Sequence, residues 1–329
     1  MNLLVTGGNG FIGSNFIAYM LKNDFKFDLV INLDKMTYAG QGENLKHMGL
    51  DNDKRYQFVF GDICDARNLQ KNVFDKFLIT HIVNFAAESH VDRSIESGLP
   101  FIQTNVLGTA TLLELVKNNK ILKKFIQVGT DEVYGSLSFN DESSCEEDPT
   151  SPRSPYSASK ESADKIALSY FITHGVPVNV TRSSNNYGPY QFPEKLIPLF
   201  VTNLMRGKKV PLYGDGKNIR DWLHVEDNCR AIRDVLFFGN TGEIYNVGGG
   251  NEFSNKDITN LILYEFGFGE EMIEGVADRK GHDLRYALNC DKIKHHVGWV
   301  PSRIGLVQGL KETIDWYKKN EDWWGALKK

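Results

Sequence analysis

Near its start the chain reads LLVTGGNGFIG at residues 3–13, a short apolar run followed at once by glycines at 7, 8, 10 and 13. A strand that ends in such a turn and opens a helix presents backbone N–H groups and a positive helix N-terminus to a diphosphate. The next apolar run ends at Asp34, 21 residues after Gly13, where a carboxylate accepts hydrogen bonds from ribose hydroxyls. The pattern predicts a dinucleotide site. Asp34 would repel a 2′-phosphate, which favours NAD over NADP, although the neighbouring Lys35 weakens that preference.

Short apolar runs alternate with helical patterns over residues 1–185. Strands are expected at residues 3–6, 29–34, 56–62, 81–86, 124–129 and 178–182, and helices at residues 11–22, 101–118 and 157–171. Alternation of this kind produces right-handed βαβ units and a parallel sheet. We therefore predict an α/β fold in which residues 1–185 form a doubly wound parallel, Rossmann-type domain.

The pattern after residue 185 is more mixed. Helices are expected at residues 195–205, 255–266 and 304–318, and strands at residues 210–213, 222–225 and 244–247. We predict a smaller mixed α/β lobe over residues 186–329, with segments near 219–248 returning to the first domain. Residues 141–148 contain five carboxylates and are expected to form a solvated loop.

Composition excludes several classes of protein. The 329 residues include 38 basic and 42 acidic side chains and have a net charge of −4, so no overall basic field attracts nucleic acid. The cysteines at 64, 145, 229 and 290 lie 61 to 84 residues apart and the eight histidines do not cluster, so neither a disulfide framework nor a metal site is expected. The first residues lack a basic signal-peptide region, and no apolar run approaches the roughly 18 residues of a membrane span. A soluble, cytoplasmic protein is predicted.

Tyr156 and Lys160 lie four residues apart, on one face of a predicted helix. Taken alone, this spacing usually marks a surface pair. A nearby cation favours the phenolate form of a tyrosine, so Tyr156 would become a usable base. Lys160 could also hold the nicotinamide ribose. With the glycine turn upstream, the pair predicts catalysis.

Thr130, Asp131 and Glu132 follow the run at residues 124–129, and Thr130 lies 26 residues before Tyr156. Adjacent carboxylates alone indicate a solvated loop. At the carboxyl end of a strand, however, their mutual repulsion would raise one pKa and leave one group protonated and the other ionised. An elimination needs such an acid and such a base.

Together these motifs resemble the extended short-chain dehydrogenase/reductase family and, within it, the nucleotide-sugar 4,6-dehydratases. The resemblance runs from residue 1 to about residue 324. Its most specific parts are AAESHVDRSI at residues 86–95, TDEVYG at 130–135, SNNYGPY at 184–190, PEKLIP at 193–198 and DRKGHD at 278–283. Related 4-epimerases share the glycine turn and the Tyr-Lys pair but typically lack the Asp-Glu pair.

The resemblance implies a role for each candidate residue. Asp131 would be the acid, Glu132 the base at C5 and Tyr156 the base at the 4-hydroxyl, with Thr130 orienting the hexose and Lys160 the cofactor. The glycine turn and the family's positions together give an NAD site at Gly7, Gly10, Phe11, Ile12, Gly13, Asp34, Lys35, Met36, Thr37, Asp62, Ile63, Phe85, Ala86, Ala87, Glu88, Ser89, Thr104, Tyr156, Lys160 and Asn186. The nucleotide-sugar site, mainly in the second lobe, would comprise Ser89, Thr130, Asn185, Lys195, Leu196, Pro211, Leu212, Tyr213, Arg220, Asn255, Asp278, Arg279, Lys280, Gly281 and His282.

The activity implied is dehydration of a nucleoside-diphosphate hexose, with dTDP-glucose favoured, to the 4-keto-6-deoxy sugar by hydride transfer from C4 to C6. A homodimer is implied as well. The family usually has Ser at Gly129, Cys at Ser183 and Pro or Leu at Lys280, so the nucleotide and the C2 substituent stay open. The alternatives are a UDP-glucose or UDP-N-acetylglucosamine 4,6-dehydratase, a nucleotide-sugar 4-epimerase or decarboxylase, and a non-catalytic NAD-sensing protein. The intact candidate catalytic residues argue against the last.

Overall fold

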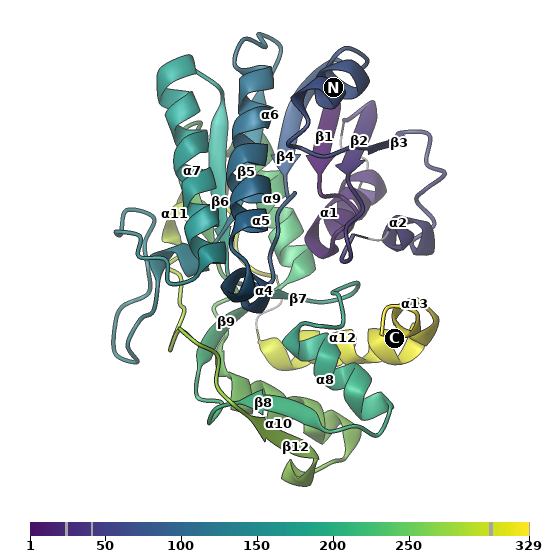
Figure 1. Ribbon diagram of the computed structural model, residues 1–329, viewed down its shortest axis with the longest axis vertical. Coiled ribbons are helices and arrows are strands. Elements are labelled where there is room, and N and C mark those ends of the chain that lie inside the picture. The colour runs from purple at the N-terminus through teal and green to yellow at the C-terminus, as the bar shows by residue number, and fades with distance from the viewer. Residues whose placement is uncertain (24–25, 41, 303–304, 329) are drawn as a thin grey trace.

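The computed structural model describes residues 1–23, 26–40, 42–302 and 305–328. Its centre is a parallel sheet of seven strands in the order β10-β6-β5-β4-β1-β2-β3 (Figure 1). The strands are β1 (Asn2–Thr6), β2 (Leu29–Asp34), β3 (Tyr56–Phe60), β4 (Ile79–Asn84), β5 (Lys124–Thr130), β6 (Val178–Ser183) and β10 (Ile244–Val247). The strand order reverses between β1 and β4, and ligands of such sheets bind at the carboxyl ends of the strands beside that point.

Helices cover both faces of this sheet because its strands are apolar on both sides. Leu3 and Val5 of β1 belong to one buried cluster, and Leu4 belongs to the other. On the first face lie α1 (Phe11–Lys22), α9 (Val225–Phe238) and α11 (Asp291–Val297); on the second lie α3 (Ala66–Leu69), α6 (Gly108–Val116) and α7 (Pro155–His174). The predicted α/β doubly wound fold is confirmed.

Several boundaries differ from those predicted; for example, the third strand ends at Phe60 and not at residue 62. The fourth strand begins and ends two residues earlier than expected, at Ile79–Asn84. The helix expected at residues 101–118 is divided into α5 (Leu99–Phe101), a π-helical segment η2 (Ile102–Leu107) and α6. Such widened turns are frequent at functional sites. Here Thr104 on the π-helical segment lines a cavity described below.

The second lobe has its own buried cluster, which includes Tyr187, Phe200, Ile262 and Trp324. It contains the parallel pair β8 (Val210–Tyr213) and β12 (Ile273–Val276), and a sheet of β7 (Asn185–Tyr187), β9 (Ile219–His224) and β11 (Glu252–Ser254). Its helices are α8 (Leu196–Met205), α10 (Asn255–Phe266), α12 (Leu306–Lys319) and α13 (Glu321–Gly325). Residue 304, where a helix was expected to begin, lies outside the described residues. Shorter elements are α2 (Glu43–His47), α4 (Val91–Glu96), η1 (Gln70–Phe74), η3 (Asp131–Tyr134) and η4 (Glu270–Met272).

The chain passes from this lobe back to the parallel sheet. After β9, helix α9 packs against α1, and β10 pairs with β6 with Ile244 opposite Val180. In Figure 1 helix α9 lies with the upper body, while α10 and β12 lie at the opposite end of the molecule. The division of the chain at residue 185 remains a prediction.

The expectation that residues 141–148 form a solvated loop is wrong for part of the stretch. Asp141, Glu142, Glu147 and Asp148 are exposed, but Glu146 is buried. Its Oε1 accepts a hydrogen bond of 2.8 Å from the Asn246 N–H at β10, and burial raises the pKa of its carboxyl. The stretch is therefore anchored to the edge of the sheet.

Among the described residues one helical stretch, Leu99–Val116, has the length and mean hydropathy (1.2) of a membrane span, although no such run was expected from the sequence. It is 44% buried and packs against α7. Buried helices of soluble proteins meet the same criteria, so this stretch is weak evidence for a membrane segment.

Candidate active site

A cavity of about 240 Å³ lies at the carboxyl ends of β1, β2, β4 and β5. Most of the residues predicted to bind the dinucleotide line it: Gly7, Gly10, Phe11, Ile12, Gly13, Asp34, Lys35, Thr37, Ile63, Phe85, Ala86, Ala87, Glu88, Ser89, Thr104, Tyr156 and Lys160. Predicted residues far apart in the sequence thus meet at one edge of the sheet.

Three predicted cofactor residues do not line this cavity. The Met36 side chain is exposed, at a positive φ of 54°, while its N–H donates to Asp34. Asp62 accepts a hydrogen bond from the Cys64 N–H and lies 3.5 Å from Lys35 Nζ. Asn186 lines the neighbouring cavity instead.

The glycine turn and Asp34 fit a dinucleotide. A Cβ at Gly13 would lie 2.3 Å from the Gly7 carbonyl oxygen, so only glycine allows α1 to begin this close to the turn. No side chain caps the N-terminus of α1, which leaves that end of the helix to an anion. The buried Asp34 carboxylate accepts hydrogen bonds from the N–H groups of Asn9 (2.9 Å) and Met36 (2.7 Å), which hold it at the end of β2.

A second cavity, of about 320 Å³, adjoins the first, and the two share Ser89, Gln191, Glu194 and Lys195. The predicted nucleotide-sugar residues that line it are Ser89, Asn185, Lys195, Leu196, Pro211, Leu212, Tyr213, Arg220, Asn255, Arg279, Lys280, Gly281 and His282. Of the remaining two, Thr130 is buried beside this cavity's Glu132, and Asp278 lies behind His282, with its Oδ1 at 2.7 Å from His282 Nδ1.

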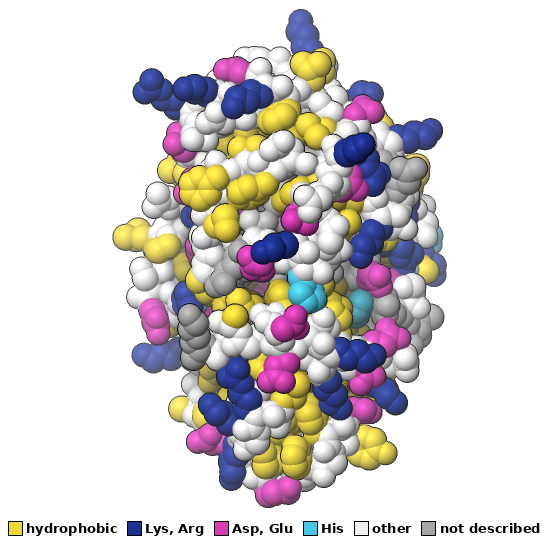
Figure 2. Space-filling model, turned by 90° about the vertical axis from the view of Figure 1, so that its right-hand side faces the viewer, with side chains coloured by type: hydrophobic (Ala, Val, Ile, Leu, Met, Phe, Trp, Pro, Cys, Tyr) yellow, Lys and Arg dark blue, Asp and Glu magenta, His cyan; other side chains and the backbone are white. Residues whose placement is uncertain are grey.

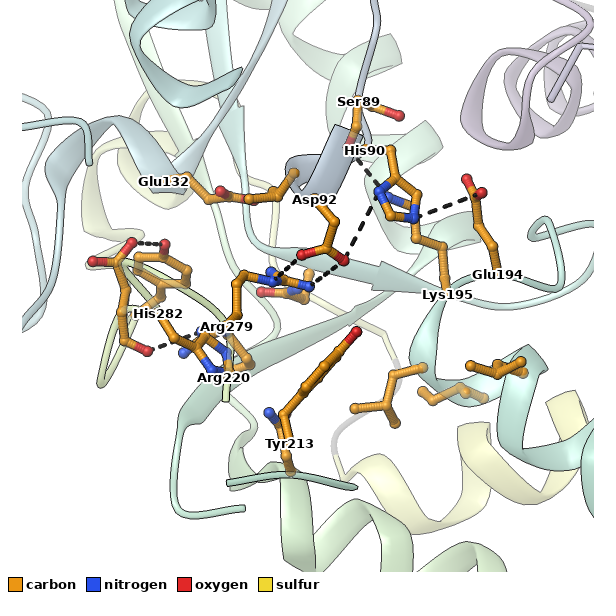
Figure 3. A pocket seen from close by; sticks show the side chains of 18 of the residues that line it. Ser89, His90, Asp92, Glu132, Glu194, Lys195, Tyr213, Arg220, Arg279 and His282 are labelled. Atoms are coloured by element: carbon orange, nitrogen blue, oxygen red, sulfur yellow. Dashed lines mark hydrogen bonds and ion pairs between the residues drawn. The ribbon is translucent and has the colours of Figure 1, made fainter. Parts of the chain in front are cut away.

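A chain of ionisable side chains crosses this cavity and was missed by sequence reasoning (Figure 3). His90 lies between Glu194, at 3.6 Å from Nε2, and Asp92, at 4.0 Å from Nδ1. Asp92 in turn lies 2.6 Å from Arg279 Nε, so a residue of α4 holds an arginine of the loop after β12. His90 and Asp92 belong to the AAESHVDRSI motif, which was the available signal, but nothing in it pointed to Arg279.

Tyr156 and Lys160 lie near the beginning of α7, which starts with Pro155 and is capped reciprocally by Ser154 and Ser157. Both side chains are buried, and Lys160 Nζ donates a hydrogen bond of 2.6 Å to the Val128 carbonyl. That Lys160, together with the positive nicotinamide, lowers the pKa of Tyr156 remains a prediction. Burial and then the charge of Glu132 raise the Tyr156 pKa, and a hydrogen bond with the Thr130 side chain opposes them.

Thr130 fixes the conformation of the two carboxylates at η3. Its Oγ1 accepts a hydrogen bond from the Glu132 N–H and donates one to Asp131 Oδ1, both at 3.3 Å. Asp131 is 3% exposed, and among the described residues its Oδ2 has no hydrogen-bond partner. Burial, and then the charge of Glu132, hold the Asp131 pKa well above its usual range.

Glu132 has different surroundings. Unlike Asp131, it lines the second cavity. Burial raises its pKa, but the positive charges of Arg220, Lys195 and Arg279 oppose that effect. Asp131 is therefore disposed to keep its proton, whereas three cations favour the ionised form of the adjacent Glu132. This is the arrangement of a general acid and a general base.

Comparisons with known proteins agree with this geometry. The sequence model of a family described as GDP-mannose 4,6 dehydratase matches residues 4–313. A dTDP-glucose 4,6-dehydratase of Streptomyces antibioticus is 49% identical over 100% of this chain and 96% of its own. Two solved structures of dTDP-glucose 4,6-dehydratases with NAD bound cover 100% of both chains: one from Streptomyces venezuelae (48% identity, TM-score 0.95) and one from Bacillus anthracis (51% identity, TM-score 0.92). The chain belongs to the nucleotide-sugar 4,6-dehydratase family of the extended short-chain dehydrogenases/reductases.

Proposed function

We propose that this protein is an NAD-dependent hydro-lyase that converts dTDP-glucose to its 4-keto-6-deoxy sugar. The observation that carries the proposal is the cluster of Thr130, Asp131, Glu132 and Tyr156 where the two cavities adjoin. An acid, a base and a phenol are needed together only when oxidation at one carbon is followed by elimination at its neighbours. The dTDP-glucose 4,6-dehydratases that match the full chain support the choice of nucleotide.

The reaction begins at the 4-hydroxyl of the hexose. Tyr156 removes the proton of this hydroxyl, while Thr130 orients the hydroxyl toward the Tyr156 phenol. When bound, NAD accepts the hydride of C4 and later returns a hydride to C6. The glycine turn would hold the diphosphate of NAD, Asp34 the adenosine ribose and Lys160 the nicotinamide ribose.

The ketone at C4 acidifies the hydrogen at C5, and this allows elimination. Glu132, the ionised member of the pair, removes the C5 proton. Asp131, which burial keeps protonated, donates its proton to the departing C6 hydroxyl, so water leaves. Glu132 then returns a proton to C5. No net oxidation remains and Glu132 ends as it began. Tyr156 has gained one proton and Asp131 has lost one, so transfer of a proton from Tyr156 to Asp131 through solvent restores both groups for the next cycle.

The two arginines of the second cavity are suited to the substrate diphosphate. The Arg220 guanidinium is buried, lies 4.3 Å above the Tyr286 ring and donates to the carbonyls of Ile219 and Asp283. Arg279 is held by Asp92. A planar guanidinium fixed in this way can donate two parallel hydrogen bonds to phosphate oxygens.

We also propose a cytoplasmic homodimer that binds neither nucleic acid nor membrane. The resemblance to the family implies the dimer. Figure 2 shows one face on which basic and acidic side chains are interspersed, without the single-sign patch that a nucleic acid or an anionic membrane surface would require.

Product mass distinguishes this function from its alternatives. The protein, supplied with NAD, is incubated separately with dTDP-glucose, UDP-glucose, UDP-N-acetylglucosamine and UDP-glucuronic acid. We expect dTDP-glucose to be consumed fastest and its product to have lost one water. Turnover only of a UDP-sugar with loss of water would correct the nucleotide, whereas a product of unchanged mass, or loss of carbon dioxide from a uronic-acid substrate, would contradict the dehydratase.

A further inference from the structure

Helix α7 carries a third ionisable side chain in line with Tyr156 and Lys160. Asp164 follows Lys160 by four residues, as Lys160 follows Tyr156, so successive turns place all three on one side of the helix. Asp164 is fully buried, with 0% of its surface exposed. The mechanism described above assigns it no role, and a buried carboxylate is costly unless something compensates its charge.

One partner of Asp164 is Arg182 on β6. Arg182 Nε lies 3.2 Å from Asp164 Oδ2, and both side chains are buried. The Arg182 guanidinium lies 4.8 Å from the Tyr134 ring centre, and the Tyr134 hydroxyl donates to Asn246. The second oxygen, Asp164 Oδ1, has no hydrogen-bond partner among the described residues. Arg182 therefore anchors one side of the carboxylate only.

The carboxylate lies directly behind the end of β5. A Cβ built at Gly129 would be 3.0 Å from Asp164 Oδ2 and 3.1 Å from Oδ1. Thr130, whose side chain opposes the rise in the Tyr156 pKa, directly follows Gly129. Asp164 therefore contacts β5 at the residue before Thr130, and on its own helix it lies one turn after Lys160.

Lys160 needs a negative charge nearby if it is to stay an ammonium ion. Its Nζ donates to the neutral Val128 carbonyl, and no ion pair of Lys160 occurs within 4.0 Å among the described residues. Burial lowers the Lys160 pKa, and the charge of Asp164 opposes this effect. An uncharged Lys160 could neither favour the Tyr156 phenolate nor donate as strongly to a ribose.

We propose that Asp164 is a positioning residue for the reaction. It keeps Lys160 charged and so maintains the position in which Lys160 Nζ binds the Val128 carbonyl. Arg182 in turn holds Asp164 in place. The proposal rests on the function proposed above, because it acts through the roles given there to Lys160 and Tyr156. It adds a requirement for a carboxylate that touches neither substrate nor cofactor.

The proposal predicts a dependence on pH. Burial raises the pKa of Asp164 to about 6, and Arg182 and Lys160 oppose this while Glu161 adds to it. Above that pH the carboxylate is charged and supports Lys160; as the pH falls through about 6, the support is lost. Tyr156 is also faced by Glu132 and Asp131, so activity alone does not isolate Asp164. Direct titration of Lys160 does.

The experiment compares the wild-type protein with Asp164→Asn and with the double variant Asp164→Asn/Arg182→Met. Removing Asp164 alone leaves Arg182 buried and unpaired and can prevent folding, whereas the double variant removes both members of that ion pair. Asp234→Asn is the matched control, because it removes a buried carboxylate that lies 2.9 Å from Arg233 on α9. Protein labelled with ¹³C at lysine Cε is titrated by NMR, and Lys160→Gln identifies the Lys160 signal.

We expect Lys160 in the double variant to lose its proton at a pH lower by about one unit, a tenfold change in the equilibrium. The kcat at neutral pH should fall about tenfold with KM nearly unchanged, whereas Asp234→Asn should match the wild type in both measurements. An unchanged Lys160 titration in a folded double variant would overturn the proposal. This measurement requires no substrate, so its result stands apart from whether dTDP-glucose is the substrate.

Discussion

Tyr156→Phe should lower kcat by about 10² to 10⁴, the usual contribution of a general base, while leaving the fold intact. The substitution removes only the phenolic oxygen. The phenylalanine ring should keep the packing of the tyrosine ring, whose centre lies 6.3 Å from that of Phe101. Only 9% of the surface of Tyr156 is exposed. Steady-state turnover of dTDP-glucose, thermal unfolding and NAD binding by calorimetry measure the three properties separately.

Tyr170→Phe is the matched control for this change. Tyr170 lies on the same helix, at its far end, and its hydroxyl donates to Glu114 on α6 outside both cavities. This variant should retain wild-type turnover. Near-normal activity of Tyr156→Phe would show that another group removes the 4-hydroxyl proton.

Glu132→Gln and Asp131→Asn should each slow formation of the 4-keto-6-deoxy sugar by about 10² to 10⁴, but at different points. Glutamine cannot remove the C5 proton, so the reaction should stop at the 4-keto hexose with C6 still hydroxylated. Asparagine at 131 leaves the base in place but cannot protonate the departing hydroxyl, so C5 exchange with solvent should continue while loss of water slows. Rapid-quench product analysis with mass detection separates the two intermediates.

Glu147→Gln provides the control for loss of an acidic side chain. Glu147 is exposed in the acidic stretch and pairs with Lys292, away from both cavities. Its kinetics should equal those of the wild type. If Glu132→Gln and Asp131→Asn also form the final product at the wild-type rate, the two carboxylates have no part in the elimination.

The parallel sheet was predictable because its strands are buried on both faces and read as near-continuous apolar runs. The exact limits of the strands were less predictable, because they depend on pairing with neighbouring strands. The fourth strand already begins at Ile79, which pairs with Asn2 of β1, whereas the sequence predicted a start at residue 81. The π-helical segment Ile102–Leu107 has the same residue composition as an ordinary helix, so its wider turn was invisible in the sequence.

The candidate site was predictable where its residues form short motifs. The glycine turn, Asp34, the carboxylate pair and the Tyr-Lys pair all follow from spacing within a few residues or from the ends of adjacent strands. Pairs of residues that only the fold brings together were not predictable. Asp92 and Arg279, for example, are 187 residues apart in the sequence. The hydrogen bond from Lys160 Nζ to the Val128 carbonyl was also not predictable, because spacing on a helix does not show which backbone group of a neighbouring strand the side chain meets.

The central claim is that oxidation at C4, elimination across C5 and C6, and reduction at C6 occur within one closed cycle. The most direct measurement follows two hydrogens of dTDP-glucose. Substrate carrying deuterium at C4 is converted in ordinary water, and unlabelled substrate is converted in heavy water. We predict that the C4 deuterium appears in the C6 methyl group, because hydride does not exchange with solvent. We predict that heavy water labels C5, because the proton held by the Glu132 carboxylate exchanges with solvent before it is returned. Loss of the C4 deuterium to solvent, or a C5 position without solvent label, would contradict the account even if the product were the 4-keto-6-deoxy sugar.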